Sequence, residues 1–518
     1  MLSRVVGLAR DVVFARVIGA DAFADVFFVA FKIPNFFRRL FAEGAFAQAF
    51  VPILGEYREK GSQAAVKELV NRVTGTLGIT LLGLTLVIVV ASPVMAAIFA
   101  PKWFFDEPDK FAATADMLRI TFPYLLFISM TGLAGGILNS YDRFAVPAFT
   151  PLLLNVTLIT AALVAAPLFD QPAFALAWGV FVAGVVQLMF QLPFLQRIHM
   201  LPKPKVDWHD SGVRKILALM GPAIFGVSVS QINLLLDTIL ATFLPTGSVS
   251  WLYYSDRLAE LPLGVFAVAI ATVILPNLSR HHAADSQQAY SETLDWALKM
   301  VLIIAVPAAV ALTLLAEPIL VTLFYYGDVM TARDMSMATL SLRAYAMGLV
   351  AFMLIKVLAP GFFARQDMRT PVRIGVVAMV SNMVLNLLFV VPLHYYWQIG
   401  HVGLAAATSV SAFLNAGLLF IYLRKKGIYV PSGHWLKFSG QLCGSVALMM
   451  VVLLGVADWL EVLNQAVWQQ LPWWQRSGNI VGLCAAGFVA YAGCLMASGF
   501  GIADVRGPAK ATATVDAG

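Results

Sequence analysis

The chain has 518 residues, of which 60% are hydrophobic and only 12% are charged. Soluble globular proteins carry roughly 25% charged residues, so this composition excludes an ordinary soluble enzyme and indicates a protein of the lipid bilayer. The three cysteines, Cys443, Cys484 and Cys494, lie in apolar stretches and form neither a disulfide framework nor a CxxC metal pair. The net charge of +6 would suit a nucleic-acid ligand, but membrane proteins place Lys and Arg by topology.

The apolar stretches predict fourteen transmembrane helices, because a bilayer core of about 30 Å needs roughly 20 apolar residues per helix. In chain order the expected spans are residues 1–19, 23–50, 72–99, 112–138, 147–167, 172–196, 213–244, 249–276, 292–315, 335–359, 373–393, 401–423, 438–458 and 477–499. The first span is not a cleavable signal peptide, since Arg4, Arg10, Asp11 and Arg16 interrupt it. We therefore expect an all-α integral membrane protein.

The segments that connect successive predicted spans alternate between rich and poor in Lys and Arg. Counted from a cytoplasmic N-terminus, the even-numbered connections and the tail carry 20 Lys and Arg residues, whereas the odd-numbered connections carry 4. This asymmetry predicts that both termini lie in the cytoplasm and accounts for the basic composition. A nucleic-acid partner is therefore not expected.

A weak internal repeat divides the predicted spans into two groups of six. The segment GAFAQAF at 44–50 resembles GVFAVAI at 264–270, and DRFAVP at 142–147 echoes DMRTP at 367–371 at nearly the same offset. An even number of spans per half gives a parallel pseudo-repeat, with the substrate site expected in a central cavity between two six-helix lobes.

The predicted division of the chain follows from this repeat. We expect an N-lobe at 1–196, a cytoplasmic linker at 197–212, a C-lobe at 213–426, a final helix pair at 427–504 and a disordered cytoplasmic tail at 505–518.

Arginines inside the predicted spans are the main functional signal. Arg10 with Asp11, Arg38 and Arg257 lie in the first, second and eighth spans, where a charge costs about 2.5–3.5 kcal/mol on insertion scales and must face protein or water. A guanidinium presents a planar fork that matches phosphate oxygens, so three arginines favour an anionic, phosphorylated substrate. The alternative is that these charges form ion pairs that only lock helices together.

A second polar set suggests an ion site. Asp237, Asn382, Asn386 and Thr408 offer oxygen ligands suited to a hard monovalent cation such as Na⁺. Asn residues in apolar helices also form hydrogen bonds between helices, which is the alternative interpretation. No other cofactor is expected.

Several long motifs resemble a known family. They are SRVVGLARD at 3–11, DVFFVAFKIPNFFRRLFAEGAFAQAFVPILGEY at 25–57, GPAIFGVSVSQI at 221–232, SVSWLYYSDRLAELPLGVF at 248–266 and KVLAPGFFARQDMRTPV at 356–372. Over essentially the whole chain, they resemble the MurJ (also called MviN) lipid II flippases of the multidrug/oligosaccharidyl-lipid/polysaccharide exporter superfamily. Family members usually begin further upstream of the SRVVG block, and we expect a misassigned start codon rather than a shortened first helix.

The resemblance implies roles for individual residues. Arg10, Asp11, Arg38 and Arg257 match the family's essential cavity residues and are expected to bind substrate. Residues expected to act as supporting or gating charges are Arg4, Asp25, Glu43, Asp256 and Glu260; all of them except Asp256 match supporting positions of the family, and Asp256 is included for its place beside Arg257.

The resemblance also implies a function. Such a protein would flip lipid II, the undecaprenyl-pyrophosphate-linked peptidoglycan precursor, from the cytoplasmic to the periplasmic leaflet of the bacterial inner membrane for cell wall biogenesis. We expect alternating access driven by the membrane potential and a lipid-tail groove along the final helix pair. Partners would be lipid II, membrane lipids and proteins of peptidoglycan synthesis or cell division.

Other functions remain open on the residues alone. The arginines suit another polyprenyl-pyrophosphate saccharide equally well, whereas a cation-coupled drug exporter of the same fold would need carboxylates at the cavity centre. The chain has no Gly-Lys dipeptide and hence no P-loop, so we expect a transporter and not an enzyme.

Overall fold

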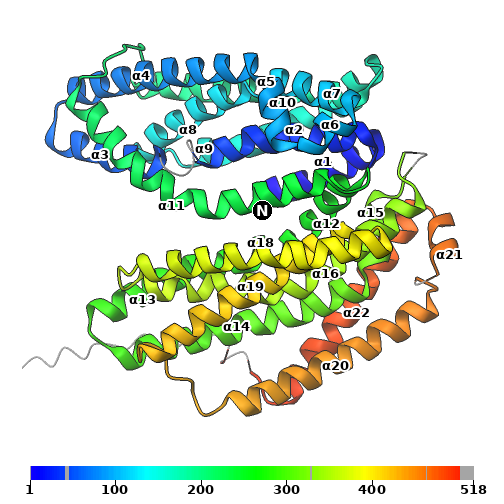
Figure 1. Ribbon diagram of the computed structural model, residues 1–518. Coiled ribbons are helices and arrows are strands. Elements are labelled where there is room, and N and C mark those ends of the chain that lie inside the picture. The colour runs from blue at the N-terminus through cyan, green and yellow to red at the C-terminus, as the bar shows by residue number, and fades with distance from the viewer. Residues whose placement is uncertain (1, 41–45, 327–328, 463, 502–503, 505–518) are drawn as a thin grey trace, which may run out of the picture. The chain divides into compact units, whose positions relative to one another are not determined.

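The computed structural model describes residues 2–40, 46–326, 329–462, 464–501 and 504. Within these residues every regular element is a helix (Figure 1). Packing divides the chain into two compact units: unit 1 comprises Met1–Tyr253 and Tyr326–Asp334, and unit 2 comprises Tyr254–Tyr325 and Met335–Gly518. Helices α12 (Ser248–Pro262) and α16 (Ala332–Leu358) contribute residues to both units.

Unit 1 holds the N-terminal helices. They are α1 (Leu2–Val17), α2 (Ala22–Phe37), α3 (Ala47–Lys60), α4 (Gln63–Val90), α5 (Ser92–Phe99), α6 (Pro101–Asp106), α7 (Pro108–Thr121), α8 (Tyr124–Ser140), α9 (Ala145–Thr160), α10 (Pro172–Arg197) and α11 (Ser211–Thr242). Helix α10 packs against α7, α8 and α9, and α11 packs against α3 and α4. Apolar residues such as Phe50, Leu69, Ile137 and Ile216 fill the core between α3, α4, α8 and α11.

Unit 2 holds the remaining helices. They are α13 (Val268–Ala283), α14 (Gln287–Leu314), α15 (Ala316–Phe324), α17 (Pro360–Phe363), α18 (Arg369–Trp397), α19 (Gly400–Lys425), α20 (Trp435–Trp459), α21 (Gln465–Gln470) and α22 (Trp473–Ala497). Helices α18 and α19 pack as one pair and α20 and α22 as another, and α20 also contacts α14. At the end of α19, Lys426 bonds to Asp367 before α18 (2.8 Å) and lowers the pKa of that carboxyl to about 2.

Eleven helical stretches of the described residues are long and apolar enough to cross a membrane. They coincide with all the predicted spans except 1–19, 23–50 and 213–244. The described residues of those three spans are largely helical, but α1 and α2 have only 16 residues each, and α11 is not among the eleven. The membrane-protein class is therefore supported, and the count of fourteen stays a prediction. Between the predicted spans 292–315 and 335–359 lies the short helix α15.

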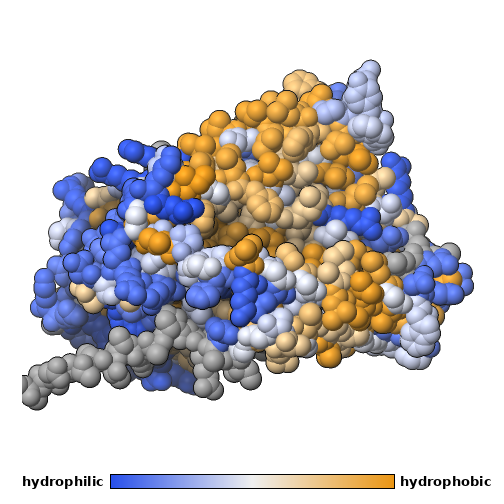
Figure 2. All heavy atoms as spheres, turned by 90° about the horizontal axis from the view of Figure 1, so that it is seen from below, coloured by the Kyte–Doolittle hydropathy of each residue, from blue (hydrophilic) through white to orange (hydrophobic). Residues whose placement is uncertain are grey.

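Large apolar side chains are exposed along these helices. Examples are Val380, Leu387 and Leu388 on α18 and Val451 on α20. On the face drawn in Figure 2, hydrophobic surface covers the middle, and hydrophilic surface gathers on the left of the view. A soluble monomer rarely exposes so much contiguous apolar surface, whereas a bilayer would cover it.

The second predicted span is interrupted. Helix α2 contains Pro34 and ends at Phe37, and residues 38–40 continue with π-helical geometry. A π-helical turn also occurs at Leu263–Ala267, and it includes the first residues of the segment 264–270 that matches 44–50 in the repeat. Such turns often mark functional positions in helices. In the second predicted span, the proline within α2 is thus followed by a change of helix type.

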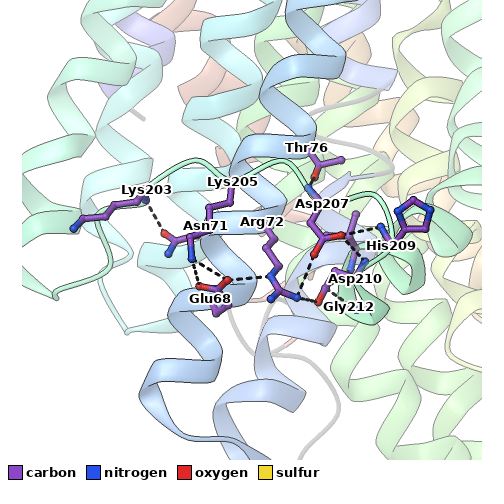
Figure 3. Close-up of polar contacts among 11 residues, drawn as sticks. Glu68, Asn71, Arg72, Thr76, Lys203, Lys205, Asp207, His209, Asp210 and Gly212 are labelled. Carbon is purple, nitrogen blue, oxygen red and sulfur yellow. Dashed lines mark hydrogen bonds and ion pairs between the residues drawn. The ribbon is translucent and has the colours of Figure 1, made fainter.

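The linker between α10 and α11 is held along α4 (Figure 3). Asn71 accepts a hydrogen bond from the Lys203 amide (2.7 Å) through its side chain and one from the Lys205 amide (3.0 Å) through its carbonyl. Gly75 makes this approach possible, because a Cβ there would lie 2.2 Å from the Lys205 carbonyl oxygen. The Asp207 amide donates to Thr76 (3.1 Å).

Ion pairs then join the linker to the start of α11. Arg72 of α4 lies 2.5 Å from the Asp210 carboxylate, and Asp210 also caps α11 by accepting from the Gly212 and Val213 amides. Glu56 of α3 bonds to Lys215 of α11 (2.5 Å), which lowers the pKa of this exposed carboxyl. The linker is therefore fixed to unit 1. The predicted lobe boundary at 197–212 does not coincide with the compact units, and the two-lobe division stays a prediction.

Candidate functional site

Arg10 is the most buried of the predicted substrate-binding arginines. It lies on α1 with 8% of its surface exposed, next to Asp11 with 2%. Its Nε and Nη2 atoms donate to Asp11 Oδ1 at 3.0 and 2.7 Å. Nη1 donates to Asn155 Oδ1 on α9 (3.0 Å), and Nη2 also donates to the Tyr253 hydroxyl on α12 (3.0 Å). Because a buried charge must be paired and hydrogen-bonded, this arrangement stabilises an ionised guanidinium inside unit 1.

Tyr253 and Asn155 complete this cluster. The Tyr253 hydroxyl donates to Asp11 Oδ1 (2.9 Å), and its ring stacks on Phe28 of α2 with centroids 4.0 Å apart. Asn155 donates in turn to the Ser3 carbonyl of α1 (3.0 Å). Neither residue was predicted from the sequence. The available signal was the single Asn in the apolar stretch 147–167, because an amide in such a helix usually bonds to a neighbouring helix.

Asp25 belongs to α2, and its carboxylate contacts the N-terminus of α12. Its carboxylate is 2% exposed and accepts from the Gly247 amide (2.7 Å), the Ser250 amide (2.9 Å) and the Ser250 hydroxyl (2.6 Å). A carboxylate at this place satisfies free N–H groups and interacts favourably with the helix dipole. Asp25 of α2 therefore fixes the start of the helix that carries Tyr253.

The other predicted charges of unit 1 are more open. Arg38 follows α2, is half-buried and donates through Nε to Asn35 Oδ1 (3.1 Å). Arg4 is exposed on α1. Glu43 lies outside the described residues.

The predicted charges of unit 2 lie on the later turns of α12. Arg257 bonds to Glu260 (3.1 Å), and both side chains are partly exposed, with Asp256 half-buried beside them. Tyr253 and Arg257 are four residues apart on this helix and therefore share one of its faces. The i, i+3 pairing of Arg257 with Glu260 agrees with the spacing in the sequence.

The proposed cation ligands divide between the units. In unit 2, Asn386 of α18 donates to Asn382 Oδ1 (3.0 Å), and Asn382 donates to Thr408 Oγ1 of α19 (3.5 Å). Both asparagines are fully buried. Asp237 lies on α11 in unit 1. Among the described residues, no group of three or more His, Cys, Asp or Glu side chains is arranged to hold a metal ion.

Comparison with known proteins gives a consistent result. The family model described as "Lipid II flippase MurJ" matches residues 14–470. The chain is 48% identical over 512 residues to a probable lipid II flippase MurJ of Vibrio cholerae, covering 98% of this chain and 95% of the relative. It is 42% identical over 516 residues to the lipid II flippase MurJ of Burkholderia cenocepacia, covering 98% and 97%.

Solved structures agree with this similarity. A lipid II flippase MurJ in an inward closed conformation matches with a TM-score of 0.77 and 25% identity, over 95% of this chain and 96% of that one. An inward-facing MATE family transporter of the MOP superfamily matches with a TM-score of 0.68 over 82% of this chain and 94% of that one, at 14% identity, which shows a shared fold alone. The fold is thus MurJ-like, the protein is a multi-pass membrane protein of a transporter class, and the chain belongs to the MurJ lipid II flippase family.

Proposed function

We propose that this protein flips lipid II from the cytoplasmic to the periplasmic leaflet of the bacterial inner membrane. The observation that carries the proposal is similarity over nearly the whole chain to curated lipid II flippases at up to 48% identity. The buried Arg10 cluster supports a polar, anion-binding role for the first helix. The same relatives favour lipid II over another polyprenyl-pyrophosphate saccharide or a drug as the substrate.

Arg10, Arg38 and Arg257 would bind the pyrophosphate, with Asp11 orienting Arg10. Two of the partners of Arg10, Asn155 and Tyr253, are neutral. Phosphate oxygens carry negative charge and fit the planar fork of a guanidinium with two parallel hydrogen bonds, so they would replace these neutral partners favourably. Asp11 would keep the guanidinium neutralised when no substrate is bound.

Alternating access would move the headgroup across the membrane. The supporting charges Arg4, Asp25, Glu43, Asp256 and Glu260 would exchange partners between the inward- and outward-open states. An inside-negative potential, worth about 2.3 kcal/mol per charge per 100 mV, favours outward movement of an anion. Equal flipping at either polarity of an imposed potential in liposomes would rule out this driving force.

The lipid tail would lie outside the headgroup cavity. A polyprenyl chain needs an apolar surface, and α20 and α22 expose large side chains such as Val451, Val481 and Phe488. This pair is therefore the proposed groove for the tail. Both termini would be cytoplasmic, and proteins of peptidoglycan synthesis or division would be the protein partners.

A monovalent cation, Na⁺, would bind at Asp237, Asn382, Asn386 and Thr408. Both asparagines are buried, and hydrogen bonds from Asn386 to Asn382 and from Asn382 to Thr408 bring three of these four side chains together, which supports this proposal. If the ion is required, flipping slows when choline replaces sodium, and an unchanged rate would contradict it.

The direct cellular test is depletion of the native flippase in a bacterium that expresses this gene. We expect the wild-type chain to restore lipid II in the outer leaflet and Arg38→Ala to fail. Arg214→Ala, which removes an exposed arginine at the start of α11, is the matched control and should complement. Membrane levels of each variant must be equal, and rescue by Arg38→Ala at such levels would contradict the site assignment.

A further inference from the structure

Unit 2 contains a pocket of about 850 Å³ whose lining includes none of the predicted substrate-binding arginines. Its walls come from the first turns of α14 and α20 and from the residues that follow α22. All three helices are candidate membrane spans, so the pocket lies at their ends, where bilayer headgroups lie. Its volume falls within the roughly 300–1,000 Å³ typical of small-ligand sites.

One wall of the pocket is held rigidly by Asp295. This carboxylate is 6% exposed and accepts from the Tyr429 hydroxyl (2.7 Å) and Trp435 Nε1 (2.6 Å). It also pairs with Lys299 (2.7 Å) and accepts from the Ser432 hydroxyl (2.9 Å). These bonds fix the segment between α19 and α20 against α14. The charges of Asp295 and Lys299 neutralise each other in this ion pair.

The pocket has donors left for a ligand. Lys437 of α20 is exposed and has no ion pair with the residues that the structure describes. Trp296 Nε1 is buried and has no hydrogen-bond partner in the described part of the chain. The first turn of α14 has no side-chain cap. An unpaired buried N–H is costly, and an anionic acceptor such as a phosphate would satisfy it.

The same pocket carries two carboxylates, Glu292 and Asp504, which are exposed and form no ion pair within the described residues. Each accepts a hydrogen bond from a neutral donor only: Glu292 from the Gln288 side chain (2.9 Å) and Asp504 from the Gly501 amide (2.8 Å). An anionic ligand would pair with the donors of the pocket but leave these two negative charges without a partner. A ligand with one negative and one positive group would pair with the donors and with the carboxylates. Phe438 and Phe500 supply apolar surface beside them.

We propose that this pocket binds a zwitterionic phospholipid with a primary amine headgroup, phosphatidylethanolamine. The phosphate is held by Lys437 and Trp296, and the ammonium by Glu292 and Asp504. The glycerol and the first acyl carbons lie against Phe438. Because the lipid would contact α14, α20 and the end of α22 together, its binding would stabilise the attachment of the α20–α22 pair to α14.

Native mass spectrometry of the purified full-length protein tests this proposal. Phosphatidylethanolamine, phosphatidylcholine, phosphatidylglycerol and soluble glycerophosphoethanolamine are titrated separately. We expect phosphatidylethanolamine to bind about tenfold more tightly than the other lipids, a ratio typical of one charge-assisted contact. Lys437→Ala and Trp296→Phe should each weaken it about tenfold, and Glu292→Gln should reduce its advantage over phosphatidylglycerol.

Lys425→Ala is the control, since this exposed lysine lies outside the pocket and should leave binding unchanged. Equal binding of the three lipids, or a preference for phosphatidylglycerol, would overturn the zwitterionic site. Wild-type affinity in Lys437→Ala and Trp296→Phe would overturn its location. Binding of the soluble headgroup as tightly as the lipid would overturn the membrane source of the ligand.

Discussion

At the scale of residues, the Arg10 cluster shows how α1 carries a charge inside the protein. The guanidinium donates to one ionised partner, Asp11, and to two neutral partners, Asn155 and Tyr253. The ionised partner neutralises the charge, while the neutral partners fix its direction. This combination leaves Arg10 stable without substrate and able to exchange neutral partners for phosphate oxygens.

Tyr253→Phe tests the positioning part of this arrangement. The change removes a hydroxyl that bonds to both Arg10 and Asp11 and keeps the ring that stacks on Phe28. We expect a loss of about 1 kcal/mol of stability and slower lipid II flipping, because Arg10 loses one of the groups that orient it. Thermal unfolding in detergent and a flipping assay measure the two effects.

The matched control is Tyr422→Phe, which removes an exposed hydroxyl on α19. It should change neither quantity. If Tyr253→Phe behaved like this control in both assays, the Tyr253 hydroxyl would have no positioning role.

The sequence predicted the charges of this cluster but not their neutral partners. Arg10 and Asp11 stand out because charges in an apolar stretch are costly. Asn155 and Tyr253 lie 145 and 243 residues away from Arg10 along the chain, and their contacts depend on how α1 packs against α9 and α12. Spacing within one helix cannot reveal such a contact, whereas a spacing of three residues is enough to predict a pair such as Arg257–Glu260.

At the scale of elements, the linker between α10 and α11 behaves as part of unit 1. Composition identified it as a basic connection, but its attachment depends on Gly75, where α4 allows the Lys205 backbone to approach.

The contacts of Arg476 also depend on how helices pack. This arginine lies just outside the predicted span 477–499, yet it belongs to α22, is 5% exposed and donates to the Val321 and Tyr325 carbonyls at the end of α15.

Gly75→Ala tests the attachment of the linker. The new methyl would lie 2.2 Å from the Lys205 carbonyl oxygen, so the linker must move away from α4 and lose its bonds to Asn71. We expect a lower unfolding temperature, a loss of about 1–3 kcal/mol, and faster tryptic cleavage after Lys205.

Gly78→Ala, one turn further along α4, is the control, since a Cβ there meets no atom within 4 Å. Alanine is the better helix former, so this control should be neutral or slightly stabilising. Identical cleavage and stability in the two variants would show that the linker is not held by this close approach.

At the scale of the whole molecule, composition was enough to assign the class. A chain with 12% charged residues exposes apolar side chains on many of its helices, and eleven stretches are able to cross a membrane. The bounds of the compact units could not be predicted from the sequence, because they depend on the packing of α11 against α3 and α4. Orientation rests on the distribution of Lys and Arg and remains a prediction.

The central claim is that arginine forks recognise the pyrophosphate of lipid II. Arg10→Lys keeps a positive charge beside Asp11, so the variant should fold, but it removes the planar fork that bonds to phosphate oxygens. Arg38→Ala removes a half-buried fork that bonds to Asn35. Arg214→Ala removes an exposed arginine and is the control.

The most direct measurement is the rate at which the purified protein moves labelled lipid II across the bilayer of liposomes with an imposed potential. We expect the wild-type protein and Arg214→Ala to flip lipid II at the same rate, and Arg10→Lys and Arg38→Ala to flip it at least about tenfold more slowly. Wild-type rates in both of these variants, with equal amounts of folded protein, would contradict the account.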